Sequence, residues 1–436
     1  MVIISAYIVL FDQNIPEVAF AAEELNKIIA KEENEIQEAS FRIIITTMDT
    51  AESSELKHKY GANTFSSLSP QGYAIRKQLT KEVMSCWIIG CDSVGAMYGV
   101  LDLADVLKTE KTIKNIRNYE TSPYIENRGI KFNIPLDART PSYSDNSDSA
   151  QHNIIEMWSM DFWSEFLDEM ALNRFNTLSL WNLHPFPSMV KVPEYPDIAL
   201  NDVKKTTIPI QATTRGLYMS TDETLNHLVT LKEMKIEDKI SFWQDVMTYA
   251  KNRGIDVYMM TWNIYTYGTE GNQYGINDEQ NNEKTIDYFR ASVRALLKTY
   301  PLLAGVGVTS GENMQSLESP YSDEEWLWRT YGKAVQDVKG IQPDRKIRFI
   351  HRAHWASLSH IEEVFADYPD TLDFSYKYSQ AHMYASVNPP NIHTDGFLDE
   401  LPRDKKTWLT VRNDDYYGFS ETDRNSQILV QLFDLG

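Results

Sequence analysis

The chain has 436 residues, which exceeds one ordinary hydrophobic core and suits a small domain followed by a barrel-sized one. Its 62 acidic and 42 basic residues give a formal charge of −20 at pH 7, which opposes binding to nucleic acid and to anionic membranes. No apolar run approaches the roughly 20 residues of a membrane span, so we expect neither nucleic acid nor a membrane as a partner.

The first 120 residues predict a small N-terminal α+β domain. The expected order is strand, helix, strand, strand, strand, helix, from the segments VIISAYIVLF, PEVAFAAEELNKIIAKEE, FRIIITT, GYAIRKQ, SCWIIG and SVGAMYGVLDLADVLK. Pro16 suits the first turn of the first helix, whose apolar residues recur at helical spacing. The charged stretch 109–128 predicts a linker that ends this domain.

The two cysteines and the N-terminus bear on the compartment. Cys86 and Cys91 lie five residues apart on one predicted strand, so their side chains point to opposite faces and we expect two free thiols. The segment MVIISAYIVLFD lacks a basic region and a small-residue cleavage site, so it predicts a first strand and no signal peptide is visible. The location would be cytoplasmic if Met1 is the natural start, and is otherwise open.

Residues 121–436 predict an α/β fold of the (β/α)8 TIM-barrel type, because short apolar runs alternate with amphipathic helices. Seven strands are expected, in the segments GIKFNIPL, NTLSLWNL, DVYMMTW, AGVGVTSG, IRFIHRAH, LDFSYKY and TWLTVRN. A closed barrel needs eight, so we expect an incomplete barrel in which strands one and seven fail to pair. Further C-terminal domains or a homodimer are expected as alternatives for additional partners. The long segment 191–236 after strand two suggests a functional loop.

Catalytic groups of such barrels come from the C-terminal ends of the strands. Glu312 directly follows strand four in VTSGENM, where a partly apolar mouth could raise its pKa enough for general acid catalysis. Asp414 and Asp415 follow strand seven in VRNDDYYGF, and one of them could act as the base. A solvated loop glutamate and a pair of turn aspartates are equally good interpretations of the sequence alone.

Other strand ends supply candidate substrate-binding groups rather than acids. With ten Trp and 24 Tyr in the chain, flat rings are available to stack on sugars, although such rings also serve as core. The density of Trp, Tyr, His, Arg and Asn at one rim predicts a carbohydrate site with extra affinity for carboxylate. The candidates are Arg128, Asp137, Arg139, Trp181, Asn182, His184, Trp262, Asn263, His351, Arg352, His354, Tyr376, Lys377 and His382.

Signals for cofactors are weak. The histidines form no tight HxH or HExxH arrangement, so we expect no metal site. No P-loop or GxGxxG follows a strand, and no GxSxG elbow is present, so we expect no nucleotide cofactor and no serine hydrolase.

The segment WIIGCDSVGAMYGVLDLADVL, with GYAIRKQ before it, resembles the N-terminal domain of α-glucuronidases of glycoside hydrolase family 67 and of β-hexosaminidases of family 20. The matching positions of the G-x-D-x-x-G-x-x-Y-G pattern are Gly90, Asp92, Gly95, Tyr98 and Gly99. NRGIKFNIPLDAR and DFWSEFLDEMALNRFNTLSLWNLHPF resemble the first strand, following helix and second strand of the same barrels. The resemblance implies the same order of domains.

Two features favour the α-glucuronidase side of this resemblance. Glu312 matches the family's acid position after strand four, and the adjacent Asp-Glu pair of hexosaminidases is missing there. The family places two base carboxylates on strand six, where LDFSYKYSQAHMY offers only Asp373. The resemblance therefore implies a divergent α-glucuronidase-like enzyme.

Three functions follow as hypotheses. The first is a glycoside hydrolase that degrades a polysaccharide such as xylan, α-glucuronidase-like, with Glu312 as acid, Asp414 or Asp415 as base, and an inverting mechanism. The second is a β-N-acetylhexosaminidase-like glycosidase. The third is a carbohydrate-binding pseudoenzyme, favoured by the missing strand-six carboxylates; an incomplete barrel would also leave this piece of chain inactive. The partner in each case is an oligosaccharide or polysaccharide.

Overall fold

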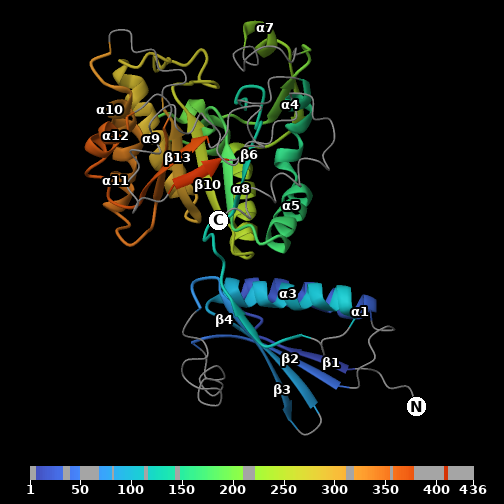
Figure 1. Cartoon of the computed structure of the whole chain (residues 1–436). Coiled ribbons are helices and arrows are strands. Elements are labelled where there is room, and N and C mark those ends of the chain that lie inside the picture. Colours follow the sequence, from blue (N-terminus) through green and yellow to red (C-terminus); the bar gives the residue numbers. More distant parts are fainter. Residues whose placement is uncertain are drawn as a thin grey trace. The chain divides into compact units, whose positions relative to one another are not determined.

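The computed structural model describes residues 6–32, 40–49, 68–80, 83–111, 116–142, 148–209, 221–310, 319–353, 357–377 and 407–410. The chain forms two compact units (Figure 1). The first comprises Met1–Ile130 with Trp163–Thr177 and Thr248–Asp256, and the second comprises Lys131–Phe162, Leu178–Met247 and Val257–Gly436.

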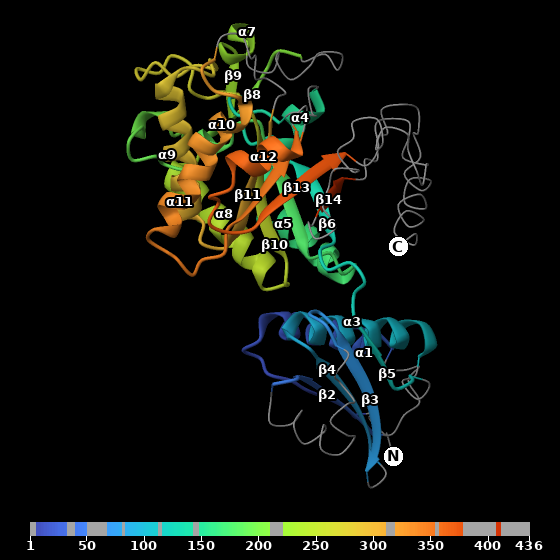
Figure 2. The same cartoon turned by 60° about the vertical axis from the view of Figure 1, so that its left-hand side comes forward.

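The first unit contains a five-stranded sheet in the order β1-β2-β4-β3-β5, with α1 and α3 on one face (Figures 1 and 2). Strands β1, β2 and β4 are parallel, and β3 is antiparallel to both of its neighbours. The predicted order of strand, helix, three strands and helix agrees with the elements from β1 to α3. The elements are β1 (Ala6–Leu10), α1 (Pro16–Glu32), β2 (Ser40–Thr47), β3 (Tyr73–Thr80), β4 (Val83–Gly90), α3 (Ser93–Glu110) and β5 (Tyr119–Thr121).

Strand β5 corrects the prediction that residues 109–128 are only a linker. Tyr119 pairs with Ile75 at the edge of β3, and the Arg76 guanidinium donates to the Tyr119 carbonyl at 2.9 Å. Arg76 also forms an ion pair with Glu120. A three-residue strand is too short to show a period of two, so only its pairing partner reveals it.

The glycine-rich pattern around Asp92 builds the start of α3. The two carboxylate oxygens of Asp92 accept hydrogen bonds from Gly95 N at 2.7 Å and from Gln71 N at 2.8 Å. A Cβ on Gly95 would lie 2.2 Å from the carbonyl oxygen of Gly72, so only glycine allows this approach. The motif therefore caps the helix and locks it to the turn before β3.

Both cysteines are free thiols, as expected. Cys86 is buried in β4, and burial raises the pKa of its thiol to about 12, so it remains protonated at neutral pH. Cys91 is half-buried directly after the same strand, and burial raises its pKa as well. Neither thiol is therefore activated as a nucleophile.

The second sheet has seven strands in the order β14-β13-β12-β11-β10-β7-β6, which confirms the seven predicted strands and their sequential arrangement. Each pair from β10 to β14 is parallel. Strands β6 and β7 also begin and end together, because Asn176 N donates to Arg128 O at their starts and Ile134 N to Trp181 O at their ends. The strands are β6 (Gly129–Asn133), β7 (Thr177–Trp181), β10 (Asp256–Trp262), β11 (Leu303–Thr309), β12 (Arg348–Arg352), β13 (Leu372–Lys377) and β14 (Thr407–Thr410).

Helices alternate with these strands and cover the outer face of the sheet (Figures 1 and 2). Helix α9 shows the local cause: Asn282 caps its start by accepting from Lys284 N, and Ile286, Phe289 and Val293 form a buried stripe at helical spacing. The main helices are α5 (Met160–Leu172), α8 (Ile236–Lys251), α9 (Glu283–Thr299), α10 (Asp323–Leu327), α11 (Lys333–Lys339) and α12 (Leu358–Val364). A π-helical turn, Trp328–Gly332, joins α10 to α11.

The sheet is strongly curled. The rings of Tyr258 on β10 and Trp408 on β14 have centroids 5.1 Å apart, although four strand spacings, or roughly 19 Å, separate the two strands along the sheet. Strands β6 and β14 are outermost, and within the described residues no backbone pairing joins them. The described part of the barrel is therefore incomplete, as predicted.

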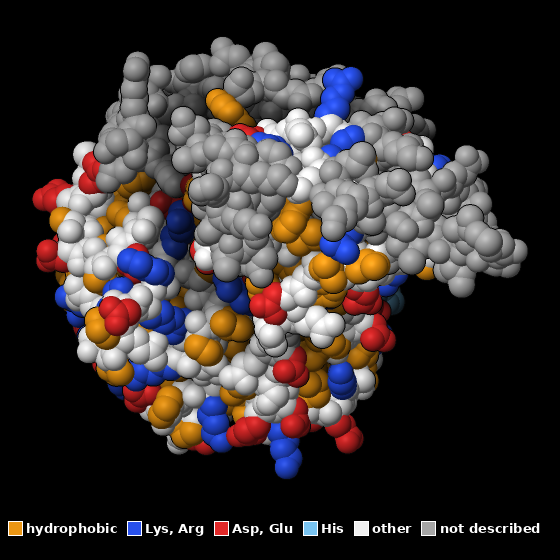
Figure 3. Space-filling view, turned by 90° about the horizontal axis from the view of Figure 1, so that it is seen from below, with side chains coloured by type: hydrophobic (Ala, Val, Ile, Leu, Met, Phe, Trp, Pro, Cys, Tyr) orange, Lys and Arg blue, Asp and Glu red, His pale blue; other side chains and the backbone are white. Residues whose placement is uncertain are grey.

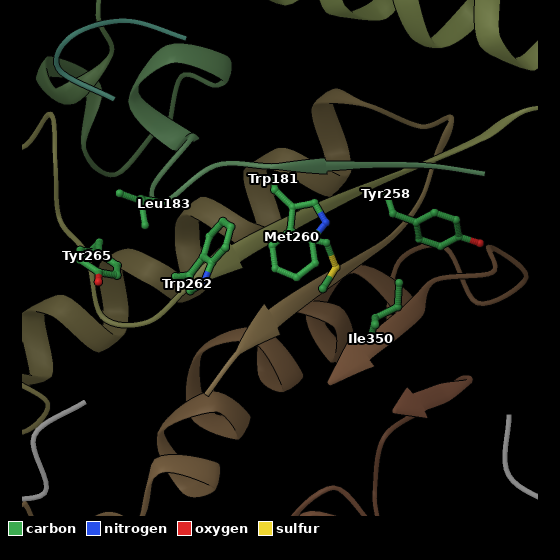
Figure 4. Packing of buried hydrophobic residues seen from close by; sticks show 7 residues of the cluster. All are labelled: Trp181, Leu183, Tyr258, Met260, Trp262, Tyr265 and Ile350. Atoms are coloured by element: carbon green, nitrogen blue, oxygen red, sulfur yellow. The ribbon is translucent and has the colours of Figure 1, made fainter. Parts of the chain in front are cut away.

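A hydrophobic cluster fills the concave face of this sheet (Figure 4). It brings together side chains from β7, β10 and β12 and from the segments that follow β7 and β10. Gly307 on β11 makes room for it, because a Cβ there would lie 2.2 Å from the Met260 sulfur. The members are Trp181, Leu183, Tyr258, Met260, Trp262, Tyr265 and Ile350.

Shorter elements occupy the connections after β6 and β7. The long segment predicted as a functional loop contains an antiparallel hairpin in which Lys204 pairs with Thr230. The elements are α4 (Asp148–Asn153), α6 (Phe186–Met189), β8 (Val203–Thr206), α7 (Asp222–Leu225) and β9 (Leu228–Lys232).

Charged side chains of both signs are interspersed on the face that Figure 3 shows, with hydrophobic side chains scattered between them. The large negative charge is thus not gathered into one patch among the described residues drawn there. No helix in the described ranges has the length and apolar character that crossing a membrane requires.

Candidate functional site

Five of the predicted site residues lie outside the described residues: Glu312, His354, His382, Asp414 and Asp415. Their roles remain predictions. The neighbouring backbone is described: Ser310 follows the end of β11 directly, and β14 ends at Thr410. For Tyr376 and Lys377 the structure describes only their place at the end of β13.

The concave face of the sheet brings two cations to one tryptophan. Lys131 Nζ on β6 lies 4.1 Å from the centre of the Trp181 ring and 5.3 Å from that of Trp262. The Arg352 guanidinium, from β12 on the other side of the curl, lies 5.2 Å from the Trp181 ring. The two tryptophan rings meet edge to face at 4.7 Å. Both cations gain from the ring faces.

The two tryptophans form the floor of this surface. Trp181 is 3% exposed and Trp262 is 1% exposed, and the Trp181 indole N–H donates to Ser179 Oγ at 2.7 Å. Lys131, by contrast, is exposed. Arg352 is 4% exposed. Lys131 therefore stands between the aromatic floor and the solvent, and an exposed ammonium attracts a negatively charged group.

Asp373 lies on the same concave face, near the amino-terminal end of β13. It is buried and accepts hydrogen bonds from the Arg348 guanidinium and, at 2.7 Å, from the Trp408 indole N–H. Its carboxylate is thus held between two side chains of neighbouring strands. This pairing gives the single carboxylate of strand six a structural role.

The ends of β10 and β11 carry buried polar atoms that no other described residue bonds. Asn263 N donates to Thr309 O at 3.3 Å, which places the two strand ends side by side. Both amide atoms of Asn263, Thr309 Oγ1 and Ser310 Oγ are buried and have no hydrogen-bond partner in the described part of the chain. Each such group costs about 1–3 kcal/mol. Groups of this kind are retained where a ligand or the chemistry uses them.

Asn182 and His184, predicted to bind substrate, are buried and serve the protein itself. The Asn182 amide donates to the carbonyls of Ile134 at 2.8 Å and Thr140 at 3.0 Å and accepts from His184 N at 2.9 Å. The His184 ring bonds through Nδ1 to the Tyr267 carbonyl and through Nε2 to the Tyr288 hydroxyl. The two residues join the loops after β6, β7 and β10, so we leave them out of the proposed substrate contacts.

His184 should make the fold sensitive to acid. Burial lowers its pKa to about 4, so the folded protein resists the proton that the unfolded chain binds near pH 6.5. Its contribution to stability is complete above pH 6.5 and is lost as pH falls towards 4, by about 3 kcal/mol. Urea unfolding at pH 7 and pH 4 should show this loss in the parent protein and not in His184→Gln. Exposed His227→Gln is the control, and equal pH dependence in all three proteins would contradict the assignment.

Asp137 and Arg139 form an ion pair in the loop after β6. Arg139 Nε donates to Asp137 Oδ1 at 2.7 Å, and Asp137 has no exposed surface. Both residues also bind the backbone of residues 201–204. They are thus placed at the carboxyl end of the strands, as predicted, but they act on a neighbouring loop.

Arg128 lies at the start of β6, so the expectation that it lines the mouth at the strands' carboxyl ends is corrected. Its guanidinium donates to Arg174 O at 2.9 Å, to Gln71 Oε1 at 2.9 Å and to the Tyr98 hydroxyl at 3.0 Å. All these groups belong to the first unit. Arg128 precedes its strand in the sequence, and parallel strands keep starts and ends on opposite edges.

His351 also faces away from the concave side. It lies on β12 between Ile350 and Arg352, which point inward, and it contacts the carboxylate of Glu324 on α10 and the ring of Phe365. Strand alternation requires this orientation.

Lys131 is a candidate site residue that the sequence-based predictions did not include. Side chains alternate along the strand GIKFN, so Lys131 lies on the face opposite Phe132. Phe132 packs near Phe162 of the covering helix α5, so Lys131 faces the concave side.

No group of three or more His, Cys, Asp or Glu within the described residues could hold a metal ion.

No family model and no curated protein matches the chain. Among solved structures, a glycoside hydrolase family 138 enzyme that targets pectin rhamnogalacturonan II matches 85% of this chain at 21% identity and a TM-score of 0.60. The match covers 38% of that enzyme's length. An exo-β-N-acetylglucosaminidase of family 20 from Vibrio harveyi matches 99% of this chain and 69% of its own, at 12% identity and a TM-score of 0.51. At these identities the likeness shows the fold alone, an α/β architecture with a TIM-like barrel.

Proposed function

We propose that this chain carries the barrel of a glycoside hydrolase that binds a sugar bearing a carboxylate at the carboxyl ends and concave face of its sheet. The observation that carries the proposal is the placement of Lys131 and Arg352 over Trp181 on that face. In a chain of net charge −20, two cationic side chains on one concave face favour an anionic group over the neutral groups of most sugars.

The buried polar atoms of Asn263, Thr309 and Ser310 support the same location. Sugar hydroxyls both donate and accept hydrogen bonds, so they suit an amide and two hydroxyls that have no partner among the described residues. Glu312 follows Ser310 by two residues, and we propose it as the general acid, with Asp414 or Asp415 as the base. Because β11 and β14 are three strands apart in a curled sheet, we expect the wide carboxylate spacing of an inverting enzyme.

Two alternatives remain in the proposal. The first is a hexosaminidase-like activity. The similar solved structures support it better than an α-glucuronidase activity, because one of the two reported above is a family 20 enzyme and neither is an α-glucuronidase. A binding protein without turnover is favoured by Asp373, whose carboxylate is occupied by Arg348 and Trp408.

A panel of substrates separates the three. Aryl glucuronides and galacturonides, aryl N-acetylhexosaminides and acidic pectic and xylan oligosaccharides should be assayed with the full-length natural protein. Turnover of uronides supports the main proposal, and turnover of N-acetylhexosaminides alone supports the second. Oligosaccharide binding in calorimetry without turnover supports the third, and the absence of both overturns all three.

Lys131→Met should raise KM for a uronide by about 10- to 100-fold, because a hydrogen bond to a charged group contributes about 1.5–3 kcal/mol. The KM for the corresponding neutral glycoside should change little. Lys131 is exposed, so the fold should tolerate the change.

Lys131→Arg is the matched control, since it keeps the charge and the contact with the Trp181 ring. An equal rise in KM for the acidic and the neutral glycoside would show that Lys131 does not recognise a carboxylate.

A further inference from the structure

A short turn, Leu200–Asp202, directly precedes β8 and connects the hairpin β8–β9 to the rest of the second unit. Figures 1 and 2 show the hairpin and α7 at the end of the second unit where the connections after β6 and β7 lie. Asp202 has a φ of +57°, which is uncommon for a residue with a side chain. This conformation turns the chain so that successive carbonyls of the turn face the loop after β6 and helix α8.

Asp137 fastens the first strand of the hairpin. Its Oδ2 accepts from Lys204 N at 2.8 Å, while Ala138 N donates to Lys204 O at 2.9 Å. Residue 204 is thus held by both of its backbone groups. The remaining capacity of the Asp137 carboxylate is filled by the backbone and side chain of Arg139.

Two cations hold the carbonyls of the turn. Arg139 Nη2 donates to Asn201 O at 3.0 Å and to Asp202 O at 3.1 Å. Lys239 Nζ, from α8, donates to Leu200 O at 2.9 Å and to Asp202 O at 2.6 Å. All three carbonyls of the turn therefore have a charged donor, and the bonds come from two different elements.

Lys239 is fully buried, with its ammonium 5.3 Å from the centre of the Trp158 ring. Burial lowers its pKa to about 8, and the Asp137 carboxylate opposes that shift. A buried ammonium is a costly way to stabilise a fold, since apolar residues of similar size often do as well. What the charge adds is a fixed geometry for the carbonyls that it binds.

We propose that Asp137, Arg139 and Lys239 are positioning residues that hold hairpin β8–β9 as a fixed wall of the substrate cleft. This rests on the proposed function, because the hairpin belongs to the connection after β7 and so stands at the edge where the sugar would bind. The loop after β10 supports the same segment, since Gln273 Nε2 donates to Asp197 at 2.6 Å. We call Asp137, Arg139 and Lys239 the clamp. The clamp residues act through the hairpin, so they should influence substrate affinity more than the chemical step.

Lys239→Met tests the clamp, because methionine fills the space without binding carbonyls. Amide hydrogen exchange in Val203–Thr206 and Leu228–Lys232 should become at least about tenfold faster, and KM should rise by about tenfold with kcat within about threefold. Arg139→Lys is a second, milder variant that keeps the charge but loses the planar fork, and it should shift both readouts in the same direction. Lys251→Met, at the exposed end of the same helix α8, is the control and should change neither.

Unchanged exchange in both clamp variants would overturn the clamp, whatever the activity. Faster exchange with an unchanged KM would overturn its link to substrate. If the parent protein neither cleaves nor binds any sugar of the panel, the proposed function fails and the substrate role of the clamp with it, while the exchange data still decide whether these residues hold the hairpin. If Lys239→Met does not fold, Arg139→Lys gives the same decision.

Discussion

Glu312→Gln should lower kcat by about 10²–10⁴-fold on a natural glycoside, the usual share of general acid catalysis. Gln keeps the size of the side chain and cannot supply the proton that the leaving oxygen needs. In the sequence it comes two positions after Ser310, and β11 ends beside polar groups of Asn263 and Thr309 that have no partner within the described ranges. Steady-state kinetics on an oligosaccharide, with NMR of the first-formed anomer, measure both the acid and the expected inversion.

An activated aryl glycoside provides the internal comparison, since its leaving group departs without a proton and should be affected much less. Glu318→Gln removes a carboxylate from the same stretch of sequence and should leave both substrates unchanged. If Glu312→Gln stays within a few-fold of the parent on the natural glycoside, another residue is the acid and the assignment to strand four is wrong.

Asn182→Ala should destabilise the fold by about 3 kcal/mol or more, the largest effect on stability that we expect from a polar residue of this site. The substitution leaves the Ile134 and Thr140 carbonyls and His184 N buried without the amide that bonds them. Urea unfolding, monitored by tryptophan fluorescence, measures the change.

Asn173→Ala is the matched control. The Asn173 amide also donates to a carbonyl, that of Glu169 at 2.8 Å, but the residue is exposed, so water replaces the bond and stability should change by less than about 0.5 kcal/mol. A loss below about 1 kcal/mol for Asn182→Ala would show that the loops after β6 and β7 hold together without it.

The architecture was predictable because strand and helix periods are local properties of the chain. The seven strands of the curled sheet and their order followed from apolar runs that alternate with amphipathic helices. The helix start at Asp92 likewise depends on residues within a few positions of one another. Strand β5 escaped prediction because it is three residues long and exists only through its pairing with β3.

The site was predictable to the level of which strand ends face one edge, and no further. Trp181 and Arg352 do meet across the curl, and Asn263 does lie beside the end of β11. Asn182 and His184 also follow a strand end in the sequence, as a ligand contact would. Their polar atoms, however, form hydrogen bonds with neighbouring loops and with Tyr288. Position along a strand therefore identified candidates without separating ligand contacts from internal ones.

By itself the sequence determined the seven strands of the curled sheet, the helices between them, their order and the two free thiols, because these depend on spacing within short segments. Only the tertiary structure decided which polar groups face a ligand, since hydrogen bonds and burial come from residues distant in the chain. Lys131 and Arg352 are 221 positions apart and share one aromatic ring because the sheet curls. Asp137, Arg139 and Lys239 meet at one turn because a loop and a helix both pack against it, and no local pattern encodes that meeting.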